Sequence, residues 1–371
     1  MLLLSITCLL GGKEAENATD EGPSAAEVAF ASKVDSLMQS AVTTGMIPGG
    51  VVCVVTSQGI VFEKAYGFRQ LTPDTLPMTT GTAFDLASLS KPVGTAMAVM
   101  TLAKEGEIDL NAPVRQYIPQ FKGEAHVVHL LTHTSGLPAY MNADVLQKRY
   151  GKCQPQALLD TICRCRRPYG VAEKENYSCL NYIVLQHIVE AVSGEDFDKY
   201  VTKHVFEVLG MKHTMYGCCK DQDIAATEIL RGEKLPLCGV THDPLARVMN
   251  GGVSGNAGVF STAGDLALLA RFMLLHKEEP MVREMTHVPD SLQFSRHTLG
   301  WGKQANDITY MGTLMSNEAY AHTGYTGTLM AIDPLRDVAI ILLTNRVHPT
   351  VRKNINPLRA AVCDAVIKSR L

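Results

Sequence analysis

Residues 84–92 read Phe-Asp-Leu-Ala-Ser-Leu-Ser-Lys-Pro, and this stretch is the most informative in the chain. Ser88 and Lys91 are three positions apart, and a helical pattern of apolar residues follows them as far as Gly106. Side chains at positions i and i+3 share one face of a helix, so the Lys91 amine is predicted to reach the Ser88 hydroxyl. A serine needs an adjacent base to become a good nucleophile, and a lysine serves when burial lowers its pKa. Ser90, next to Lys91, is expected to point elsewhere, and the spacing alone also fits a helix N-cap followed by a surface lysine.

Strand patterns occur at both ends of the chain. A hairpin is predicted from residues 51–56 and 60–66, joined by a turn at Ser57-Gln58-Gly59. A second hairpin is predicted from residues 328–333 and 337–344, around Pro334-Leu335-Arg336. These two pairs of strands are expected to lie in one antiparallel sheet.

Helical patterns flank the strands and fill the middle of the chain. The capping-box spacing at Ser24 predicts a helix that ends near Gly45, and a last helix is predicted over residues 357–369. Helical patterns also dominate residues 84–290. We therefore expect an α+β fold, with an antiparallel sheet formed from both chain termini, flanked by helices, and a mostly helical region inserted into it.

The predicted organisation is one domain over residues 24–371. Its α/β part comprises about 24–83 and 291–371, and its helical part about 84–290. Residues 1–23 are expected to form a signal or anchor segment and a linker, because residues 1–10 are apolar and residues 13–24 are polar.

Composition excludes several classes of protein. The chain has 371 residues, 46% of them hydrophobic, and 34 basic against 37 acidic side chains give a net charge of −3. Disorder is excluded for most of the chain, because disordered chains combine low hydrophobicity with high net charge. A nucleic-acid-binding protein would carry a basic surplus or stripe. The longest clean apolar run, residues 338–343, is too short for a membrane span, which needs about 20 residues.

The N-terminal segment predicts export to the periplasm or a membrane anchor, although it lacks a basic start. Cys8 lies in a context loosely like a lipoprotein attachment site. The ten cysteines are scattered and none forms a Cys-x-x-Cys pair, which favours buried thiols and keeps a cytoplasmic location as the alternative. A zinc site from Cys218, Cys219, Cys238 and His242 matches no known spacing, so neither a metal nor an organic cofactor is expected.

Two later segments complete an ordered set of motifs. Tyr177-Ser178-Cys179 lies near the middle of the chain, and His322-Thr323-Gly324 lies near its end. With Ser88-x-x-Lys91 before them, the chain resembles the penicillin-binding protein and β-lactamase superfamily. It is most similar to the class C-like branch, whose members show Ser-x-x-Lys, Tyr-x-Asn and Lys-Thr-Gly or His-Thr-Gly in that order. The segments at 106–114, 130–138 and 251–258 also match that branch, so the resemblance spans about residues 30–368.

The branch contains class C β-lactamases, D-Ala-D-Ala carboxypeptidases, D-aminopeptidases and β-lactamase-like esterases. The resemblance implies that Ser88 forms an acyl-enzyme, while Lys91 and Tyr177 share the general base and acid work. It implies an oxyanion hole from the backbone N–H groups of Ser88 and Tyr325, and a substrate-binding strand at His322, Thr323 and Gly324. His133 and His242-Asp243 are interpreted as loop structure, and Trp301 as core or a pocket wall.

Two positions depart from the branch. Cys179 stands where the branch has an asparagine, and a thiol is a weak donor. His322 stands where many members have a lysine, so a fixed cation becomes a group that is mostly neutral near pH 7. Both changes favour an esterase or peptidase over an efficient β-lactamase, acting on a small-molecule or peptide substrate. The alternative is a catalytically silent relative that binds peptides or peptidoglycan, and the sequence leaves the oligomeric state open.

Overall fold

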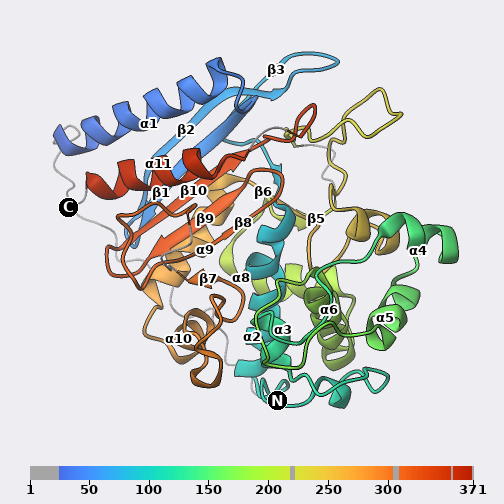
Figure 1. Ribbon diagram of the computed structural model, residues 1–371. Coiled ribbons are helices and arrows are strands. Elements are labelled where there is room, and N and C mark those ends of the chain that lie inside the picture. The colour runs from blue at the N-terminus through green and yellow to red at the C-terminus, as the bar shows by residue number, and fades with distance from the viewer. Residues whose placement is uncertain (1–24, 218–221, 304–308, 352–353, 370–371) are drawn as a thin grey trace.

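The computed structural model describes residues 25–217, 222–303, 309–351 and 354–369. The predicted leader and its cysteine, and the helix start at Ser24, lie outside these residues. A sheet with its covering helices forms one part, and a mostly helical part lies beside it (Figure 1). The sheet has seven strands in the order β3-β2-β1-β10-β9-β8-β7, and every neighbouring pair is antiparallel. Its strands are β1 (Gly49–Thr56), β2 (Gly59–Gln70), β3 (Leu76–Pro77), β7 (Gly302–Lys303), β8 (Tyr320–Thr323), β9 (Leu329–Asp333) and β10 (Val338–Thr344).

The centre of the sheet joins the two ends of the chain. β1 pairs with β10, with Val52 opposite Leu342 and Val54 opposite Ile340. Both strands are buried along their whole length, and alternate residues enter two different cores, as the two-residue period of a strand requires. The prediction of one antiparallel sheet built from both termini is confirmed, and both predicted hairpins lie in it.

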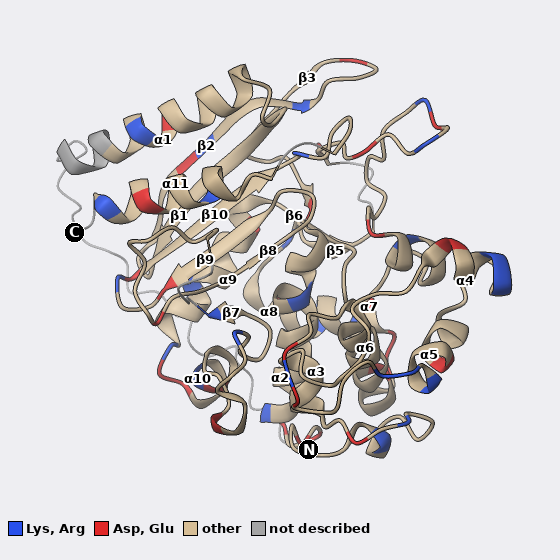
Figure 2. Cartoon of the chain, in the orientation of Figure 1, with Lys and Arg blue, Asp and Glu red and all other residues tan. Residues whose placement is uncertain are grey.

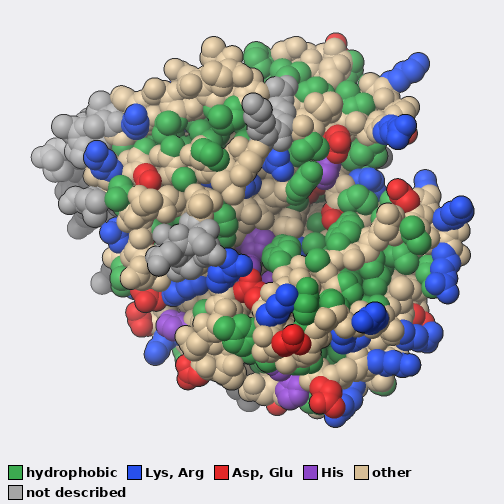
Figure 3. Space-filling model, in the orientation of Figure 1, with side chains coloured by type: hydrophobic (Ala, Val, Ile, Leu, Met, Phe, Trp, Pro, Cys, Tyr) green, Lys and Arg blue, Asp and Glu red, His purple; other side chains and the backbone are tan. Residues whose placement is uncertain are grey.

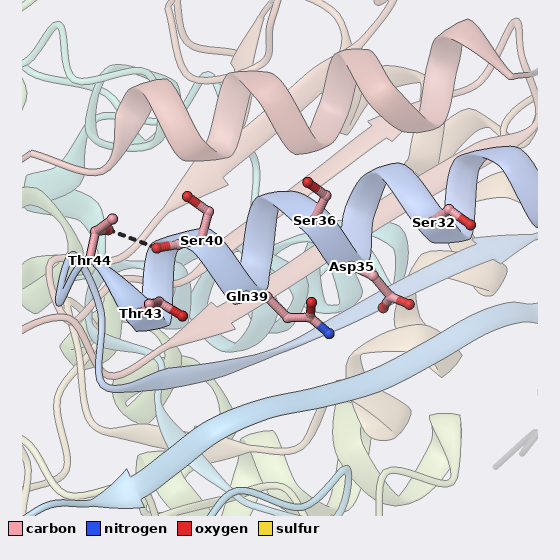
Figure 4. A pocket seen from close by; sticks show the side chains of 7 residues that line it. All are labelled: Ser32, Asp35, Ser36, Gln39, Ser40, Thr43 and Thr44. Atoms are coloured by element: carbon pink, nitrogen blue, oxygen red, sulfur yellow. Dashed lines mark hydrogen bonds between the residues drawn. The ribbon is translucent and has the colours of Figure 1, made fainter.

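Two helices cover one face of this sheet. α1 (Ala25–Thr43) and α11 (Asn356–Lys368) lie side by side on it (Figure 1), and their apolar side chains share a core with Val52 and Val54. α9 (Ala263–Leu275) packs against β1 and β10 from the opposite face. An open polar hollow of about 520 Å³ lies along α1 (Figure 4). It is lined only by α1 and the turn after it, through Ser32, Asp35, Ser36, Gln39, Ser40, Thr43 and Thr44.

The middle of the chain is mostly helical, as predicted, but it also contains a small sheet. The α-helices are α2 (Met97–Lys104), α3 (Val127–Leu131), α4 (Ala143–Tyr150), α5 (Pro155–Arg164), α6 (Cys179–Ser193), α7 (Phe197–Val201), α8 (Glu207–Leu209) and α10 (Pro280–Thr286). Short 3₁₀ turns are η2 (Ala87–Leu89), η4 (Val114–Gln116) and η7 (Asp290–Leu292), and π-helical turns are η3 (Lys91–Ala96), η5 (Thr202–Phe206) and η6 (Leu245–Met249). The small sheet has the order β4-β6-β5, from β4 (Phe84–Asp85), β5 (Met215–Tyr216) and β6 (Val259–Ser261). The sequence did not predict it, because strands of two or three residues carry no readable periodicity.

Among the described residues, no helix is both long and apolar enough to cross a membrane. Charges of both signs are interspersed over the molecule (Figure 2). A hollow lies where the sheet part meets the helical part, and histidine side chains are visible in it (Figure 3).

Candidate active site

The nucleophile candidate begins the helical part at a strained turn. Ala87 has φ 47°, in the left-handed region that is uncommon for a residue with a side chain. Its N–H donates to the Asp85 carboxylate over 2.8 Å, which holds the turn between β4 and η2. Ser88 follows and is half-buried, so its hydroxyl remains accessible. Ser90 points away, because its buried hydroxyl accepts the Val259 N–H over 3.1 Å.

Lys91 is fully buried, and its ammonium has three acceptors. Nζ lies 3.0 Å from Ser88 Oγ, 2.9 Å from the Asn256 carbonyl oxygen and 3.6 Å from Cys179 Sγ. The approach of the amine to the Ser88 hydroxyl is therefore confirmed. Burial does lower the pKa of Lys91, as expected, but the negative charge available to Cys179 and Tyr177 outweighs it and the pKa is raised overall.

Tyr177 lies beside both residues. The Lys91 ammonium is 5.2 Å from the centre of its ring. Burial raises the pKa of the Tyr177 phenol, and this effect exceeds the lowering by the Lys91 charge and by hydrogen bonds to Ser88 and Lys91. Lys91 and Tyr177 therefore form a pair of titratable groups beside the Ser88 hydroxyl, which contacts both.

His133 supports Tyr177 from behind. The two rings lie 4.3 Å apart, and His133 Nδ1 accepts the Ser178 N–H over 3.1 Å. This acceptor role leaves the proton on Nε2 and makes the ring neutral. Burial, reinforced by nearby positive charge, places the pKa of His133 well below its usual value. His133 therefore has a structural role, as interpreted from the sequence, but that role serves the site.

The sequence analysis missed a second supporting pair, His297 and Glu175. The His297 ring lies 5.0 Å from His133 and 5.7 Å from Tyr177, and Nδ1 is 2.9 Å from Glu175 Oε1. Burial alone would raise the pKa of Glu175, but the contact with His297 and hydrogen bonds from residues 295–296 lower it to about 2. No spacing rule points to this pair, since the two residues are 122 positions apart.

His322 lies at the end of β8 and carries no positive charge. Its Nδ1 donates to the Thr323 carbonyl oxygen over 2.9 Å, which leaves Nε2 as an acceptor. Burial and the charge of Lys91 hold its pKa well below the usual value. The ring lies 6.1 Å from Tyr177, so His322 joins the same site, but as a neutral group.

The turn after β8 is fastened to the backbone that precedes Ser88. The Thr326 hydroxyl donates to the Asp85 carbonyl oxygen over 2.7 Å, and the Thr328 hydroxyl donates to that of Leu86 over 3.0 Å. Within the described parts of the chain, neither the Ser88 nor the Tyr325 N–H donates to a protein acceptor. These two donors are therefore available to an oxyanion, as the family resemblance implies.

The two remaining candidate regions line the mouth of the site. The Tyr325 ring is 53% exposed and stacks on His242 at 5.6 Å. The His242 N–H donates to Asp85 Oδ2 over 2.6 Å, and its ring lies 3.0 Å from Glu228. The loop interpretation of His242-Asp243 was therefore incomplete, because this loop forms a wall of the site.

Trp301 is fully buried and packs on Tyr320, so it belongs to the core.

The described residues contain no group of three or more His, Cys, Asp or Glu side chains that could hold a metal ion. Two members of the zinc alternative, Cys218 and Cys219, lie outside these residues. Cys238 and His242 have protein partners of their own, at Ile224 and Glu228.

The chain is similar to several known proteins in sequence and in fold. A model of the family described as Beta-lactamase matches residues 34–364. The chain is 32% identical over 372 residues to a Salmonella enteritidis protein described as a putative D-alanyl-D-alanine carboxypeptidase, covering 88% of this chain and 85% of that protein. The solved structure of EstCE1, a hydrolase with promiscuous acyltransferase activity, has a TM-score of 0.76 and 21% identity over 93% of this chain and 100% of that one. A class C β-lactamase has a TM-score of 0.73 and 20% identity, covering 92% and 97%.

Proposed function

Because the chain belongs to the β-lactamase family of serine hydrolases, we propose that it hydrolyses ester or amide bonds through an acyl-enzyme on Ser88. The observation that carries the proposal is the 3.0 Å contact between Lys91 Nζ and an accessible Ser88 hydroxyl, with Tyr177 beside both. Nucleophile and proton-transfer groups within hydrogen-bond reach are the signature of nucleophilic catalysis.

The reaction has two steps. Ser88 Oγ attacks the carbonyl carbon while its proton is relayed through the Lys91–Tyr177 pair: one member takes the Ser88 proton as the pair gives a proton of its own to the leaving oxygen or nitrogen. A water molecule then attacks the acyl carbon, and its proton is relayed through the same pair to Ser88 Oγ as the acyl bond to Oγ breaks. The carboxylic acid is released and the Ser88 hydroxyl is restored. The N–H groups of Ser88 and Tyr325 stabilise the negative oxygen in both steps, and removing one such donor costs about 3 kcal/mol.

The substrate contacts favour esters or simple amides over β-lactams. A β-lactam offers an acylamide arm and a carboxylate. Cys179 is a poor partner for the arm, and the neutral His322 is a poor partner for the carboxylate. Arg359 does not replace it, because its guanidinium already donates to the carbonyl oxygens of Gly324 and Thr328 over 2.9 Å each. An activated short-chain ester needs only the nucleophile, the proton-transfer pair and the oxyanion hole.

The test compares p-nitrophenyl butyrate with nitrocefin at matched concentration. We expect the ester to be cleaved and nitrocefin to be turned over roughly 10²–10⁴ times more slowly than by a dedicated β-lactamase, if two lost contacts add. Ser88→Ala should abolish ester turnover and labelling by a fluorophosphonate.

Ser90→Ala is the matched control. It should keep a large fraction of the turnover while losing about 1–3 kcal/mol of stability, because the buried Val259 N–H loses its acceptor. A wild-type protein that binds a penicillin or peptide but neither turns over ester nor labels Ser88 would support the catalytically silent alternative. Nitrocefin hydrolysis faster than ester hydrolysis would overturn the substrate preference.

A further inference from the structure

One carboxylate, that of Asp243, lies in the loop whose His242 ring stacks on Tyr325. Asp243 is half-buried, and among the described residues no Lys, Arg or His forms an ion pair with it. Its Oδ2 accepts the Tyr140 hydroxyl over 3.1 Å, and its Oδ1 accepts the Ala246 N–H over 2.9 Å. A carboxylate has about four lone-pair sites, so these two hydrogen bonds leave acceptor capacity that faces solvent.

Contacts on both sides connect the loop that carries Asp243 to residues of the site. The preceding residue, His242, is bonded through its N–H to Asp85, three positions before Ser88. On the other side, Tyr140 follows Ala139, whose carbonyl oxygen accepts the Cys179 N–H over 2.9 Å. The charge of Asp243 is one of the causes that raise the pKa of Lys91 and of Cys179. The carboxylate therefore acts on the same space as the nucleophile.

The surroundings of Asp243 suit a cation. Tyr140 is 38% exposed and Tyr325 is 53% exposed, and they flank residues 242–243 on either side. Exposed aromatic faces and an unpaired carboxylate both attract an ammonium group. His322, across the site, is neutral and does not compete for the carboxylate. Two arginines near this loop are engaged elsewhere: Arg247 donates to the carbonyl oxygens of Thr241 and His242, and Arg346 lies over the Tyr325 ring at 4.9 Å and donates to the Tyr325 carbonyl oxygen.

We propose that Asp243 binds a protonated amino group of the substrate, so that the site selects acyl groups that carry a primary amine close to the scissile carbonyl. The proposal rests on the proposed hydrolysis at Ser88 and names its substrate class. A purely structural role for Asp243, as the acceptor that caps the turn at Ala246, is the competing explanation.

The test uses pairs of p-nitroanilides that differ only in charge. D- or L-alanine p-nitroanilide is compared with the isobutyric anilide, in which a methyl group replaces the ammonium, and β-alanine p-nitroanilide with the butyric anilide. Succinic mono-p-nitroanilide supplies an anion. We expect kcat/KM to be higher for the amine substrates than for their methyl isosteres. Asp243→Asn should lower this ratio of kcat/KM values by about tenfold or more, since a charge-assisted hydrogen bond is lost. The variant keeps an oxygen for the Ala246 N–H, and thermal melting checks its fold.

Asp144→Asn is the matched control. It makes the same charge change at an exposed position of α4, where Asp144 forms no hydrogen bond or ion pair with a described residue. It should leave the ratio of kcat/KM for amine and methyl isostere as in the wild type. The proposal is overturned if the wild type shows no preference for the amines, if Asp243→Asn leaves the ratio unchanged, or if the succinic probe is preferred.

Failure of the proposed hydrolysis would be recognised separately, as no cleavage of p-nitrophenyl butyrate or of any anilide. Calorimetric binding of alaninamide and isobutyramide to the Ser88→Ala protein then decides the assignment of Asp243. Binding of alaninamide should be tighter by about tenfold, and this difference should disappear when Asp243→Asn is added. Equal binding of the two amides would overturn the proposal.

Discussion

At the scale of single residues, Cys179 is the substitution with the largest chemical effect on the site. It begins α6, and its thiol lies 3.6 Å from Lys91 Nζ. Burial raises the pKa of the thiol above its usual value, although the Lys91 charge lowers it, so the group is a neutral, weak donor. Next to it lies the buried Asn256 side chain, whose Nδ2 has no acceptor stronger than this thiol among the described residues. The thiol therefore stands at the family's asparagine position without the hydrogen-bonding capacity of an amide.

Cys179→Asn should restore that contact. The new amide can donate to the acylamide arm of a β-lactam, and its oxygen can accept from Asn256. We expect the ratio of nitrocefin to p-nitrophenyl butyrate turnover to rise, by up to about tenfold for one neutral hydrogen bond. Cys179→Ser is the matched control, because it adds polarity without the reach of an amide. A ratio that does not change, or that rises equally with serine, would contradict this explanation.

At the scale of elements, the site depends on how closely the end of β8 approaches η2. A Cβ atom on Gly324 would lie 2.1 Å from Thr328 Oγ1 and 2.2 Å from the Leu86 carbonyl oxygen. Only a residue without a side chain allows this approach, which brings the turn that carries Tyr325 against the backbone just before Ser88. Arg359, from α11, holds the same turn through two carbonyl oxygens.

Gly324→Ala should therefore damage catalysis more than folding. The backbone must shift away from Leu86, which moves one oxyanion donor, and loss of such a donor lowers kcat by about 10²–10³. We expect a fall in kcat for p-nitrophenyl butyrate of at least about tenfold, measured beside a thermal melt. Gly264→Ala in α9 is the control, because its added Cβ would meet only Glu63, at 3.9 Å. Wild-type kcat in Gly324→Ala would show that the close approach is not required.

At the scale of the whole molecule, the site forms only when both ends of the chain are in place. β1 and β10 pair across nearly the full sequence, and the Ser57 hydroxyl donates to Asp337 over 2.7 Å. The helical part supplies Ser88 and Tyr177, while the C-terminal strands supply His322. Closing this structure buries His133 and His322 almost completely as neutral rings.

Global stability should therefore fall as the solution becomes acidic. Both histidines have folded pKa values well below the usual 6.5, so the unfolded chain binds more protons. Stability is then fully present above about pH 6.5 and is lost as the pH falls below it. Each group should contribute a loss on the order of 1 kcal/mol between about pH 7.5 and 5.5. Urea unfolding at these two pH values measures the difference.

His322→Asn should remove about half of that loss, because one of the two titrating rings is gone. The same substitution at the surface residue His276 is the control and should leave the loss as in the wild type. Equal pH dependence in His322→Asn and the wild type would show that burial of His322 does not carry this effect.

The hairpins, the two terminal helices and the contact of Lys91 with Ser88 could be predicted from the amino-acid sequence, because each depends on residues that are neighbours along the chain. Two-residue periodicity located the two hairpins, and 3.6-residue periodicity located α1 and α11 to within a few residues. The i, i+3 spacing predicted the contact of Lys91 with Ser88, because one helical turn brings these positions together whatever the rest of the chain does. The catalytic roles of Ser88, Lys91 and Tyr177 stay predictions until the variants are measured.

Which distant residues share a surface follows from the packing of the whole chain. Glu175 meets His297 and Tyr140 meets Asp243 across more than a hundred positions, and no local pattern encodes either contact. The protonation of Lys91, His133 and His322 was also beyond the sequence, because it follows from how deeply each group is buried and which charges surround it. Burial and electrostatic neighbours arise from the packing of the whole chain, whereas periodicity and spacing are properties of short segments.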